Sequence, residues 1–517
     1  MLGKIVFAVA LSVAVASLVF AGEPVRSNGK GGGPWSAPTT WQGGKVPSGQ
    51  PVVVLSKDVV DLDASAGPVL VCEEIEVDPQ GALRVVGKNK TTLTVQVGKA
   101  LRVFGGLMVD FSKDPEGRFE CVMTNAVERP PEFLVSDGCK IVCKGAPGAA
   151  PNVAFRIVTN ALPAGATAPK SVALTLGPKM YIDFESALLE GFDIQATGMD
   201  GSGVKFNERC SFRNCQFLRS HVTFSYCKKI EFEGNRISDT PAQTQGVYFL
   251  GVLNSRFTSN VVERTASSMA GFHSYGSSDC ELADNIFRNC YYGMNLVACS
   301  EINLSQNRFE TNTYGLFLNS CGRIAGQRTM FDGNTSYQLF ATFASPVEYR
   351  FFNSVFVNSP TNKDTACLGV DGICTVDIVN SPLQSFAKEN TRGPIVFSVY
   401  VDILVTNEQG APLGRVPMRV LAGDKVVATS RTEAVGARTG YTPLPSTHRP
   451  LIVPWTRVAP AQGITTPPAA TTYQLEVDGT SLGYAKQVVP LAVDESFVRP
   501  DPEKPTKTIT VKLAKAN

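Results

Sequence analysis

The stretch GMNLVACSEINLSQNRF, residues 293–309, decides the fold of this chain because its pattern returns along the sequence. A Gly and an Asn position enclose 14-residue arms in four consecutive stretches. These arms are Gly246 to Asn260, Gly271 to Asn285, Gly293 to Asn307 and Gly315 to Thr329. Repetition on this scale predicts a solenoid in which each repeat forms one coil.

The apolar residue two places after each Asn position marks seven repeats between about residues 205 and 358, at steps of 20, 25, 25, 22, 22 and 25 residues. The markers are Phe217, Ile237, Val262, Phe287, Phe309, Phe331 and Phe356. Within a repeat, apolar and polar residues alternate, which is the period of a strand with one buried face. Helical repeats need longer units, and the Leu ladder of leucine-rich repeats is missing. The sequence therefore predicts an all-β chain, a right-handed single-stranded parallel β-helix followed by a small β-sandwich.

Three short motifs carry a family resemblance: Gly-Asn-Arg-Ile (234–237), Asp-Asn-Ile-Phe (284–287) and Gln-Asn-Arg-Phe (306–309). They resemble the parallel β-helix repeats of the pectate-lyase-like superfamily. The resemblance implies one short turn per coil with a left-handed residue, a conformation that Asn tolerates. A reaction needs a single site, but this Asn recurs from coil to coil. We therefore expect a structural hydrogen-bonded ladder, formed by Asn235, Asn260, Asn285 and Asn307.

Residues 1–21 have the composition of a secretory signal peptide, with Lys4, an apolar run from Ile5 to Phe20 and a cleavage site near Ala21. No other stretch is long and apolar enough to span a membrane. The protein is therefore expected to be secreted, either extracellular or in the cell envelope or periplasm. Its 48 basic and 46 acidic residues form no long run of one sign, so no nucleic-acid partner is indicated.

All thirteen cysteines precede residue 375, and export makes oxidation possible. Cys299 and Cys321 each stand eight residues before the Asn position of their coil, so they should stack on neighbouring coils. Either a ladder of buried thiols or a disulfide fits that arrangement. Cys367 and Cys374 close a short loop and are a second disulfide candidate. A metal site is not indicated by cysteine spacing, since no second pair accompanies Cys139 and Cys143.

A Gly-rich linker over residues 22–34 is expected to lead into a β-rich block, residues 35–150, that begins the β-helix. Short β-branched runs broken by Gly, Pro and Asp predict strands joined by tight turns. The segment from Trp41 to Val54, followed by Asp61-Leu-Asp63, resembles the eight-glycine domain of extracellular proteins. That resemblance implies carbohydrate binding, and capping of the first coil is the alternative.

The β-helix repeats are expected over residues 151–392, and the composition changes at about residue 395 to a Cys-free segment rich in Pro and Thr. The segment from Val401 to Gly414, with the short runs that follow it, resembles the carboxypeptidase-regulatory-like, transthyretin-like β-sandwich. The resemblance implies an accessory module at residues 395–517, which would contact glycans or other envelope proteins. Nothing there reads as catalytic, and His448 and Trp455 lie in a Pro-rich insertion.

Two neighbouring coils carry loops three residues longer than the others, Ser238–Gln245 and Glu263–Ala270, and such loops build the wall of a groove. Strand alternation places Val247, Phe272, Met294 and Leu316 inward. It places two rows outward: Tyr248, His273, Asn295 and Phe317, then Leu250, Tyr275, Val297 and Asn319. Aromatic rings for sugars beside His273, one of three histidines, predict a polysaccharide-binding face that includes Tyr248, Tyr292 and Asn295. The alternatives are that these are ordinary solvent-facing residues or that another domain covers them.

Cleavage of the polysaccharide is a further hypothesis. A lyase needs a base, either His273 or a deprotonated Tyr275 or Arg264, and a cation such as calcium to neutralise a uronate carboxylate. A hydrolase needs two carboxylates, for which Asp239 and Glu263 are the nearest pair. The charges after the Asn turns alternate between coils. Such a pattern usually forms a surface ion-pair ladder, which is the alternative to a catalytic role.

Known β-helix active-site signatures are missing from this chain. No two Asp residues are adjacent, as polygalacturonases require, and the pectate-lyase Trp-Ile-Asp-His signature is absent. If the protein is an enzyme, a polysaccharide lyase is favoured over a glycoside hydrolase, and no cofactor is evident. Binding without cleavage stays equally open, and a structural envelope or matrix protein, with the solenoid as a rigid spacer, is the alternative of another class.

Overall fold

The computed structural model describes residues 23–125, 131–136, 138–148, 150–159, 172–200, 203–204, 209–265, 268–357, 368–381, 393–432, 451–458, 470–499 and 507–516. The expected signal peptide, Cys367 and His448 lie outside these residues. The chain divides into two compact units, Met1–Glu281 and Leu282–Asn517. Both contain parallel strands that pair with a strand one coil further along the chain, as predicted for a β-helix.

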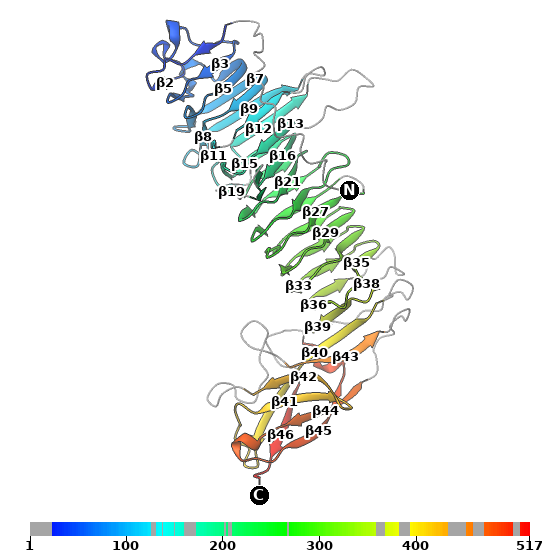
Figure 1. Cartoon of the computed structure of the whole chain (residues 1–517). Helices are drawn as coiled ribbons and strands as arrows, with labels where there is room; N and C mark the ends of the chain where they lie inside the picture. The colour runs from blue at the N-terminus through cyan, green and yellow to red at the C-terminus, as the bar shows by residue number, and fades with distance from the viewer. Residues whose placement is uncertain are drawn as a thin grey trace. The chain divides into compact units, whose positions relative to one another are not determined.

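Three ladders of parallel strands form the first unit, shown from blue to green in Figure 1. The first ladder contains β1 (Val25–Arg26), β3 (Val52–Val54), β5 (Val69–Val77), β7 (Thr92–Val103), β10 (Glu132–Val135), β13 (Val172–Leu176), β16 (Phe192–Thr197), β21 (His221–Ser225), β24 (Val247–Leu250) and β27 (Ala270–Tyr275). The second branches from the long strand β7 and contains β9 (Arg118–Asn125), β12 (Val153–Thr159), β15 (Ala187–Glu190), β20 (Gln216–Leu218), β23 (Arg236–Ser238) and β26 (Val261–Glu263).

The third ladder contains β2 (Gly32–Pro34), β4 (Val59–Asp61), β6 (Ala82–Val86), β8 (Gly106–Asp110), β11 (Lys140–Lys144), β14 (Tyr181–Glu185), β19 (Arg209–Arg213), β22 (Ile230–Glu233) and β25 (Arg256–Thr258). Short elements between coils are η1 (Pro38–Thr40), η2 (Gln42–Gly44), η3 (Ala64–Ala66) and the antiparallel pair β17 (Met199–Asp200) and β18 (Gly203–Val204). Pairing of β2 with β4 means that part of the expected Gly-rich linker forms a strand of the first coils.

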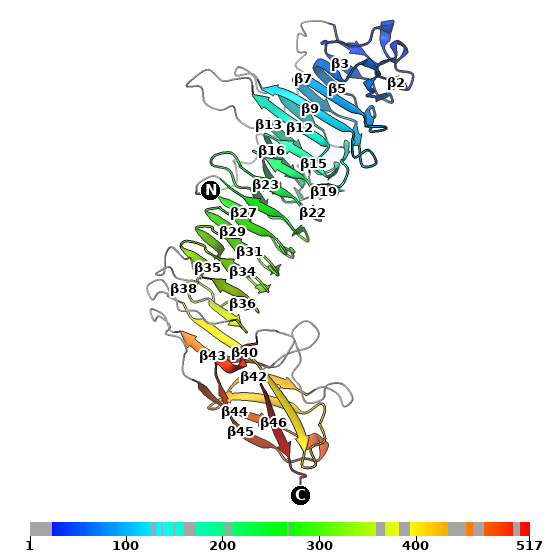
Figure 2. The same cartoon turned by 180° about the vertical axis from the view of Figure 1, so that it is seen from behind.

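The second unit repeats the arrangement with its own three ladders, seen from behind in Figure 2. One contains β28 (Ile286–Arg288), β31 (Arg308–Glu310), β34 (Met330–Asp332) and β37 (Val355–Val357). Another contains β29 (Tyr292–Val297), β32 (Tyr314–Asn319), β35 (Tyr337–Phe343) and β38 (Leu368–Gly372). The last contains β30 (Ile302–Asn303), β33 (Ile324–Gln327), β36 (Glu348–Phe352), β39 (Thr375–Val379) and β40 (Ile395–Asn407).

Strand β40 joins the coils to the C-terminal β-structure, because its first half pairs with β39 and its second half pairs with β46 (Thr508–Leu513). Strand β43 (Leu451–Val458) pairs antiparallel with β40. An antiparallel sheet follows, in the order β42 (Lys425–Arg431), β41 (Pro417–Ala422), β44 (Thr471–Val477) and β45 (Gln487–Val493), with η5 (Thr480–Leu482) and η6 (Glu495–Phe497) between strands. The fold is thus all-β, with small antiparallel and mixed sheets after the solenoid. The family identities expected for both flanking blocks stay predictions.

The residues that mark the repeats form the core. Phe309 lies between Phe287 and Phe331, with ring centroids 5.4 and 5.0 Å apart, and Phe356 continues the stack at 4.8 Å. All seven marker residues are buried. Stacking one large apolar side chain per coil removes most of its surface from water, and this burial drives the coils together.

The Asn ladder is confirmed, with a correction to its geometry. The amide N–H of Asn235 donates to Oδ1 of Asn260 at 2.9 Å, and that of Asn285 donates to Asn307 at 3.0 Å. The expectation that Asn itself takes the left-handed conformation is wrong. That conformation belongs to the preceding residue in each coil, namely Gly234, Ser259, Asp284 and Gln306. The turn residue faces outward, so the following Asn can point inward and satisfy buried backbone groups.

Cys299 and Cys321 are buried on neighbouring coils of the second unit, as their spacing predicts. A hydrogen bond between the two side chains, together with burial, raises the pKa of Cys321 far above its ordinary value. The Cys321 side chain is therefore a protonated thiol and not a thiolate in this environment. Formation of a disulfide here, or between Cys367 and Cys374, stays a prediction.

Asp377 on β39 is expected to make the stability of the second unit pH-dependent. It is 3% exposed and accepts a hydrogen bond from Ser398 Oγ at 2.7 Å. Burial raises its pKa from 3.8 to about 6, so the folded state holds this proton more tightly than the unfolded state. The stabilisation is fully present below the unfolded pKa and is lost as pH rises through about 6. Urea titrations should show the free energy of unfolding falling by about 3 kcal/mol across this range.

Asp377→Asn keeps an acceptor for Ser398 and removes the titrating group. Its unfolding free energy should lack this downward step between the two pKa values. An unchanged step in the variant would assign the pH dependence to another group.

Candidate functional site

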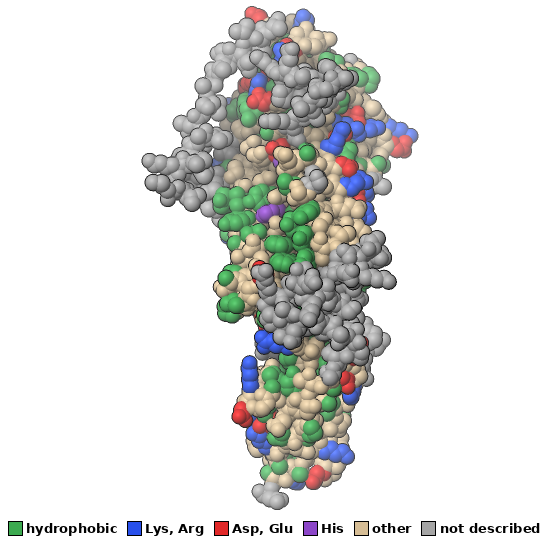
Figure 3. All heavy atoms as spheres, turned by 90° about the vertical axis from the view of Figure 1, so that its right-hand side faces the viewer, with side chains coloured by type: hydrophobic (Ala, Val, Ile, Leu, Met, Phe, Trp, Pro, Cys, Tyr) green, Lys and Arg blue, Asp and Glu red, His purple; other side chains and the backbone are tan. Residues whose placement is uncertain are grey.

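The outward face of β21, β24 and β27 in the first unit carries most of the predicted glycan-binding residues. The register pairs Tyr248 with His273 and Leu250 with Tyr275. Their neighbours Val247 and Phe272 point inward and are fully buried. The two predicted outward rows are therefore confirmed in this unit. Figure 3 shows histidine side chains, in purple, among hydrophobic side chains, in green.

Tyr248 and His273 form the centre of this face. Their rings make an edge-to-face contact with centroids 5.0 Å apart. Gln245, the last residue of the first long loop, places Nε2 3.1 Å from Nδ1 of His273. Burial lowers the pKa of His273 below its ordinary value, so the imidazole is neutral at pH 7. The predicted loop therefore reaches the face and orients the histidine.

Tyr275 differs from its neighbours in its exposure. It is 50% exposed. Tyr275 makes none of the ring contacts found among the described residues, whereas Tyr248 and His273 contact each other. Its ring is therefore open to a ligand that approaches β27 from solvent.

An Asp–His pair that the sequence did not predict lies on the same face. Nε2 of His221 lies 2.8 Å from Oδ1 of Asp193, and Gln195 Nε2 donates to the other carboxylate oxygen at 2.9 Å. Desolvation opposes ionisation of Asp193, but the bonds from His221 and Gln195 hold its pKa below the ordinary value. His221 is one of three histidines, which was a usable signal. Asp193 precedes the regular repeats, so no constant repeat spacing aligns it with His221 in the sequence.

Tyr292 and Asn295 lie on β29 in the second unit. The predicted pairing of Asn295 with Phe317 is confirmed, and Tyr292 pairs with Tyr314. An aromatic ladder extends from these residues over the outward faces of β32 and β35. It contains Tyr291, Tyr292, Tyr314, Phe317, Tyr337 and Phe340.

Stacking within the aromatic ladder covers the ring faces. Phe317 and Phe340 are 5.3 Å apart with planes 6° from parallel, and Tyr314 and Tyr337 are 5.6 Å apart at 18°. Burial raises the pKa values of Tyr292 and Tyr314, so their hydroxyls stay protonated. Cross-strand aromatic pairs of this kind stabilise the sheet. The ring faces in this ladder are therefore less open to a ligand than the ring of Tyr275.

The remaining catalytic candidates lie at the corner after β23 and β26. Arg264 forms a bidentate ion pair with Asp239, at 2.7 and 2.9 Å. Glu263 is 3% exposed and pairs with Arg236 on the previous coil. Each carboxylate is thus held by an arginine, which is the arrangement of the predicted ion-pair ladder. A catalytic role for these three residues stays a prediction.

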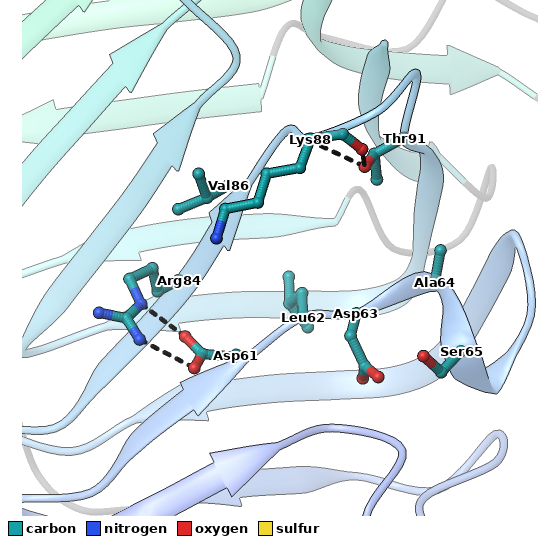
Figure 4. Close-up of a pocket in the computed structure, with 9 residues that line it drawn as sticks. All are labelled: Asp61, Leu62, Asp63, Ala64, Ser65, Arg84, Val86, Lys88 and Thr91. Carbon is teal, nitrogen blue, oxygen red and sulfur yellow. Dashed lines mark hydrogen bonds and ion pairs between the residues drawn. The ribbon is translucent and has the colours of Figure 1, made fainter. Parts of the chain in front are cut away.

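A polar pocket of about 650 Å³ lies at the start of the first unit, between the turn that contains η3 and the loop after β6. Figure 4 shows its lining, which consists of Asp61, Leu62, Asp63, Ala64, Ser65, Arg84, Val86, Lys88 and Thr91. The volume falls in the range of small-molecule sites. Part of it belongs to the segment whose sequence resembles the eight-glycine domain.

Within the part of the chain that the structure describes, no three His, Cys, Asp or Glu side chains come together as a metal site requires. No helix among these residues has the length and apolar character to cross a membrane.

Comparison with known proteins finds one family model that matches part of the repeats. The family model NosD, described as a periplasmic copper-binding protein, matches residues 192–366. No curated protein matches the chain.

Solved structures with a similar fold include the periplasmic alginate epimerase AlgG, at 11% identity, with a TM-score of 0.42 over 62% of this chain and 84% of that chain. The Dettilon tailspike protein is similar at 11% identity, with a TM-score of 0.30 over 78% of this chain and 74% of that one. The A-module of the mannuronan C-5 epimerase AlgE6 from Azotobacter vinelandii matches at 11% identity and a TM-score of 0.19, over 66% and 87% of the two chains. At such identities the likeness concerns the fold alone.

Proposed function

We propose that this chain is an exported β-helix protein that binds a polysaccharide on the outward face of β24 and β27. The half-exposed ring of Tyr275, beside His273 on the same strand, is the observation that carries the proposal. An open aromatic ring packs against the C–H face of a pyranose, and adjacent polar groups bond its hydroxyls. The expected signal peptide supports export.

The hydrogen bond to His273 favours binding over cleavage. When the Gln245 amide donates to Nδ1, that nitrogen is the acceptor and the ring proton lies on Nε2. The Nε2–H group of the neutral ring is then a hydrogen-bond donor. A lyase base needs a free nitrogen lone pair directed at the substrate. His273 therefore suits a sugar oxygen better than a carbon-bound proton.

The wild-type mature chain, residues 22–517, is expected to be retained on a polysaccharide column without releasing an ultraviolet-absorbing product. Tyr275→Ala should weaken the apparent affinity about tenfold, because the open ring supplies the apolar contact. The experiment compares a panel of neutral and uronate-containing polymers, with and without calcium.

Tyr226→Ala, at a turn outside the rows of this face, is the matched control and should bind as the wild type does. An unsaturated product that disappears in His273→Ala would make the protein a lyase. Retention unchanged in Tyr275→Ala would exclude this face, and no retention on any polymer would favour the structural spacer.

A further inference from the structure

The polar pocket beside η3 contains two carboxylates that accept hydrogen bonds from the protein, and two cationic side chains, of which Arg84 is ion-paired with Asp61. Oδ1 and Oδ2 of Asp61 accept from Nε and Nη2 of Arg84, at 2.5 and 2.8 Å. Asp63 accepts from the amide and hydroxyl of Ser36, at 2.9 and 2.5 Å. Both carboxylates therefore have donors from the protein.

Arg84 and Lys88 keep donors for another molecule. Nε and Nη2 of Arg84 are engaged by Asp61, which leaves the Nη1 group of the guanidinium available. The Lys88 amine has no ion-pair partner among the described residues. Figure 4 shows the Lys88 side chain extending past Val86 toward Arg84. Two positive groups thus approach the same side of the pocket, where an anion would bind them both.

The rest of the lining suits a hydroxylated ligand. An ionised carboxylate has about four lone-pair sites, so Asp61 and Asp63 can each accept further bonds after their protein donors are counted. Ser65 is exposed, and Val86 presents an apolar surface that is 38% exposed. A ligand that satisfies this set carries one anionic group, several hydroxyl donors and an apolar C–H face.

We infer that this pocket is a second binding site, specific for an acidic sugar unit such as a uronate. The sugar carboxylate would bind Lys88 and Arg84, while ring hydroxyls donate to Asp61 and Asp63 and the C–H face contacts Val86. A peptide carboxylate supplies the anion but lacks the vicinal hydroxyls, so it leaves the acceptors unused. The assignment is independent of the face on β24 and β27.

Titration of the full mature chain with a short oligogalacturonate, followed by isothermal calorimetry, tests this assignment. Lys88→Gln should weaken binding about tenfold, because a charge-assisted hydrogen bond is lost. Arg84→Gln should weaken it as well, although that change also frees Asp61. Lys90→Gln is the matched control, because Lys90 lies two residues away and pairs with Glu116 outside the pocket. It removes the same charge and should leave affinity unchanged.

Equal losses in Lys88→Gln and Lys90→Gln would reduce the effect to overall charge and overturn the assignment. So would equal binding of an uncharged oligosaccharide of the same length, or of acetyl-tetra-alanine with a free carboxylate. The Tyr275→Ala variant separates the two sites. It should bind the oligogalacturonate at this pocket as the wild type does, even if the proposed function of the sheet face fails.

Discussion

Asn307→Ala is expected to lower the free energy of unfolding by about 3 kcal/mol, because it breaks four hydrogen bonds inside the second unit. Oδ1 of Asn307 accepts from the amide and side chain of Asn285, both at 3.0 Å. Its Nδ2 donates to the carbonyls of Leu282 and Leu304, at 2.6 and 2.8 Å. In the alanine variant these donors and carbonyls stay buried but lose their hydrogen-bond partner, and water does not reach them to replace it.

Asn303→Ala is the matched control, since Asn303 is exposed and its side-chain oxygen accepts from the amide and hydroxyl of nearby Ser305. Its effect should stay within about 0.5 kcal/mol. Urea unfolding followed by far-ultraviolet circular dichroism measures both variants. Similar small losses in the two would mean that the Asn ladder does not hold the coils together, and the structural interpretation of the repeated Asn would be wrong.

The period of the sequence determined the repeats because each coil needs the same inward residue at the same place. Phe287, Phe309 and Phe331 stack as their spacing predicts. Strand alternation then assigned the outward rows correctly, since one face is buried and a slip of one residue would expose Val247 or Phe272. These predictions depend on burial alone, and burial leaves a direct trace in the sequence.

Backbone conformation at the turns was harder to predict from the sequence. The residues that adopt the left-handed conformation before the Asn positions include Gly234, Ser259, Asp284 and Gln306, which share no side-chain chemistry. A residue other than Gly costs about 1–2 kcal/mol in this conformation, and the turns of this chain accept that cost at Ser259 and Gln306. The repeated Asn therefore looks like the turn residue in the sequence, although its role in the structure is to bond the next coil.

Side-chain partners across coils were the least predictable part of the site. Asp193 and His221 are 28 positions apart in a region where coil lengths vary, so no constant spacing reveals that they meet. The pocket beside η3 depends on how the chain after β4 and the loop after β6 turn outward from their strands. The path of a loop depends on its local turn residues and on its contacts with neighbouring elements. A single sequence shows the turn residues but not the contacts.

Arg499→Ala is expected to destabilise the second unit more than any other single change considered, by about 3–5 kcal/mol. Arg499 is 4% exposed and forms an ion pair with Asp402 on β40, which is 2% exposed. Its backbone N–H donates to Asn380 Oδ1 at 2.7 Å, and its guanidinium lies 5.1 Å from the ring centroid of Tyr400. Burial raises the pKa of Asp402, and Arg499 opposes that shift. Removal of the arginine leaves a buried carboxylate without its cation.

The same truncation at Arg323 provides the comparison that isolates burial. Arg323 pairs with Glu301 at 3.5 Å, but its side chain is 81% exposed, so Arg323→Ala should cost under about 1 kcal/mol. The double variant Arg499→Met with Asp402→Leu removes both charges and should recover most of the stability lost in Arg499→Ala. Recovery would show that the cost comes from the stranded carboxylate of β40. A double variant as unstable as Arg499→Ala would instead assign the loss to packing against Tyr400, which methionine does not replace.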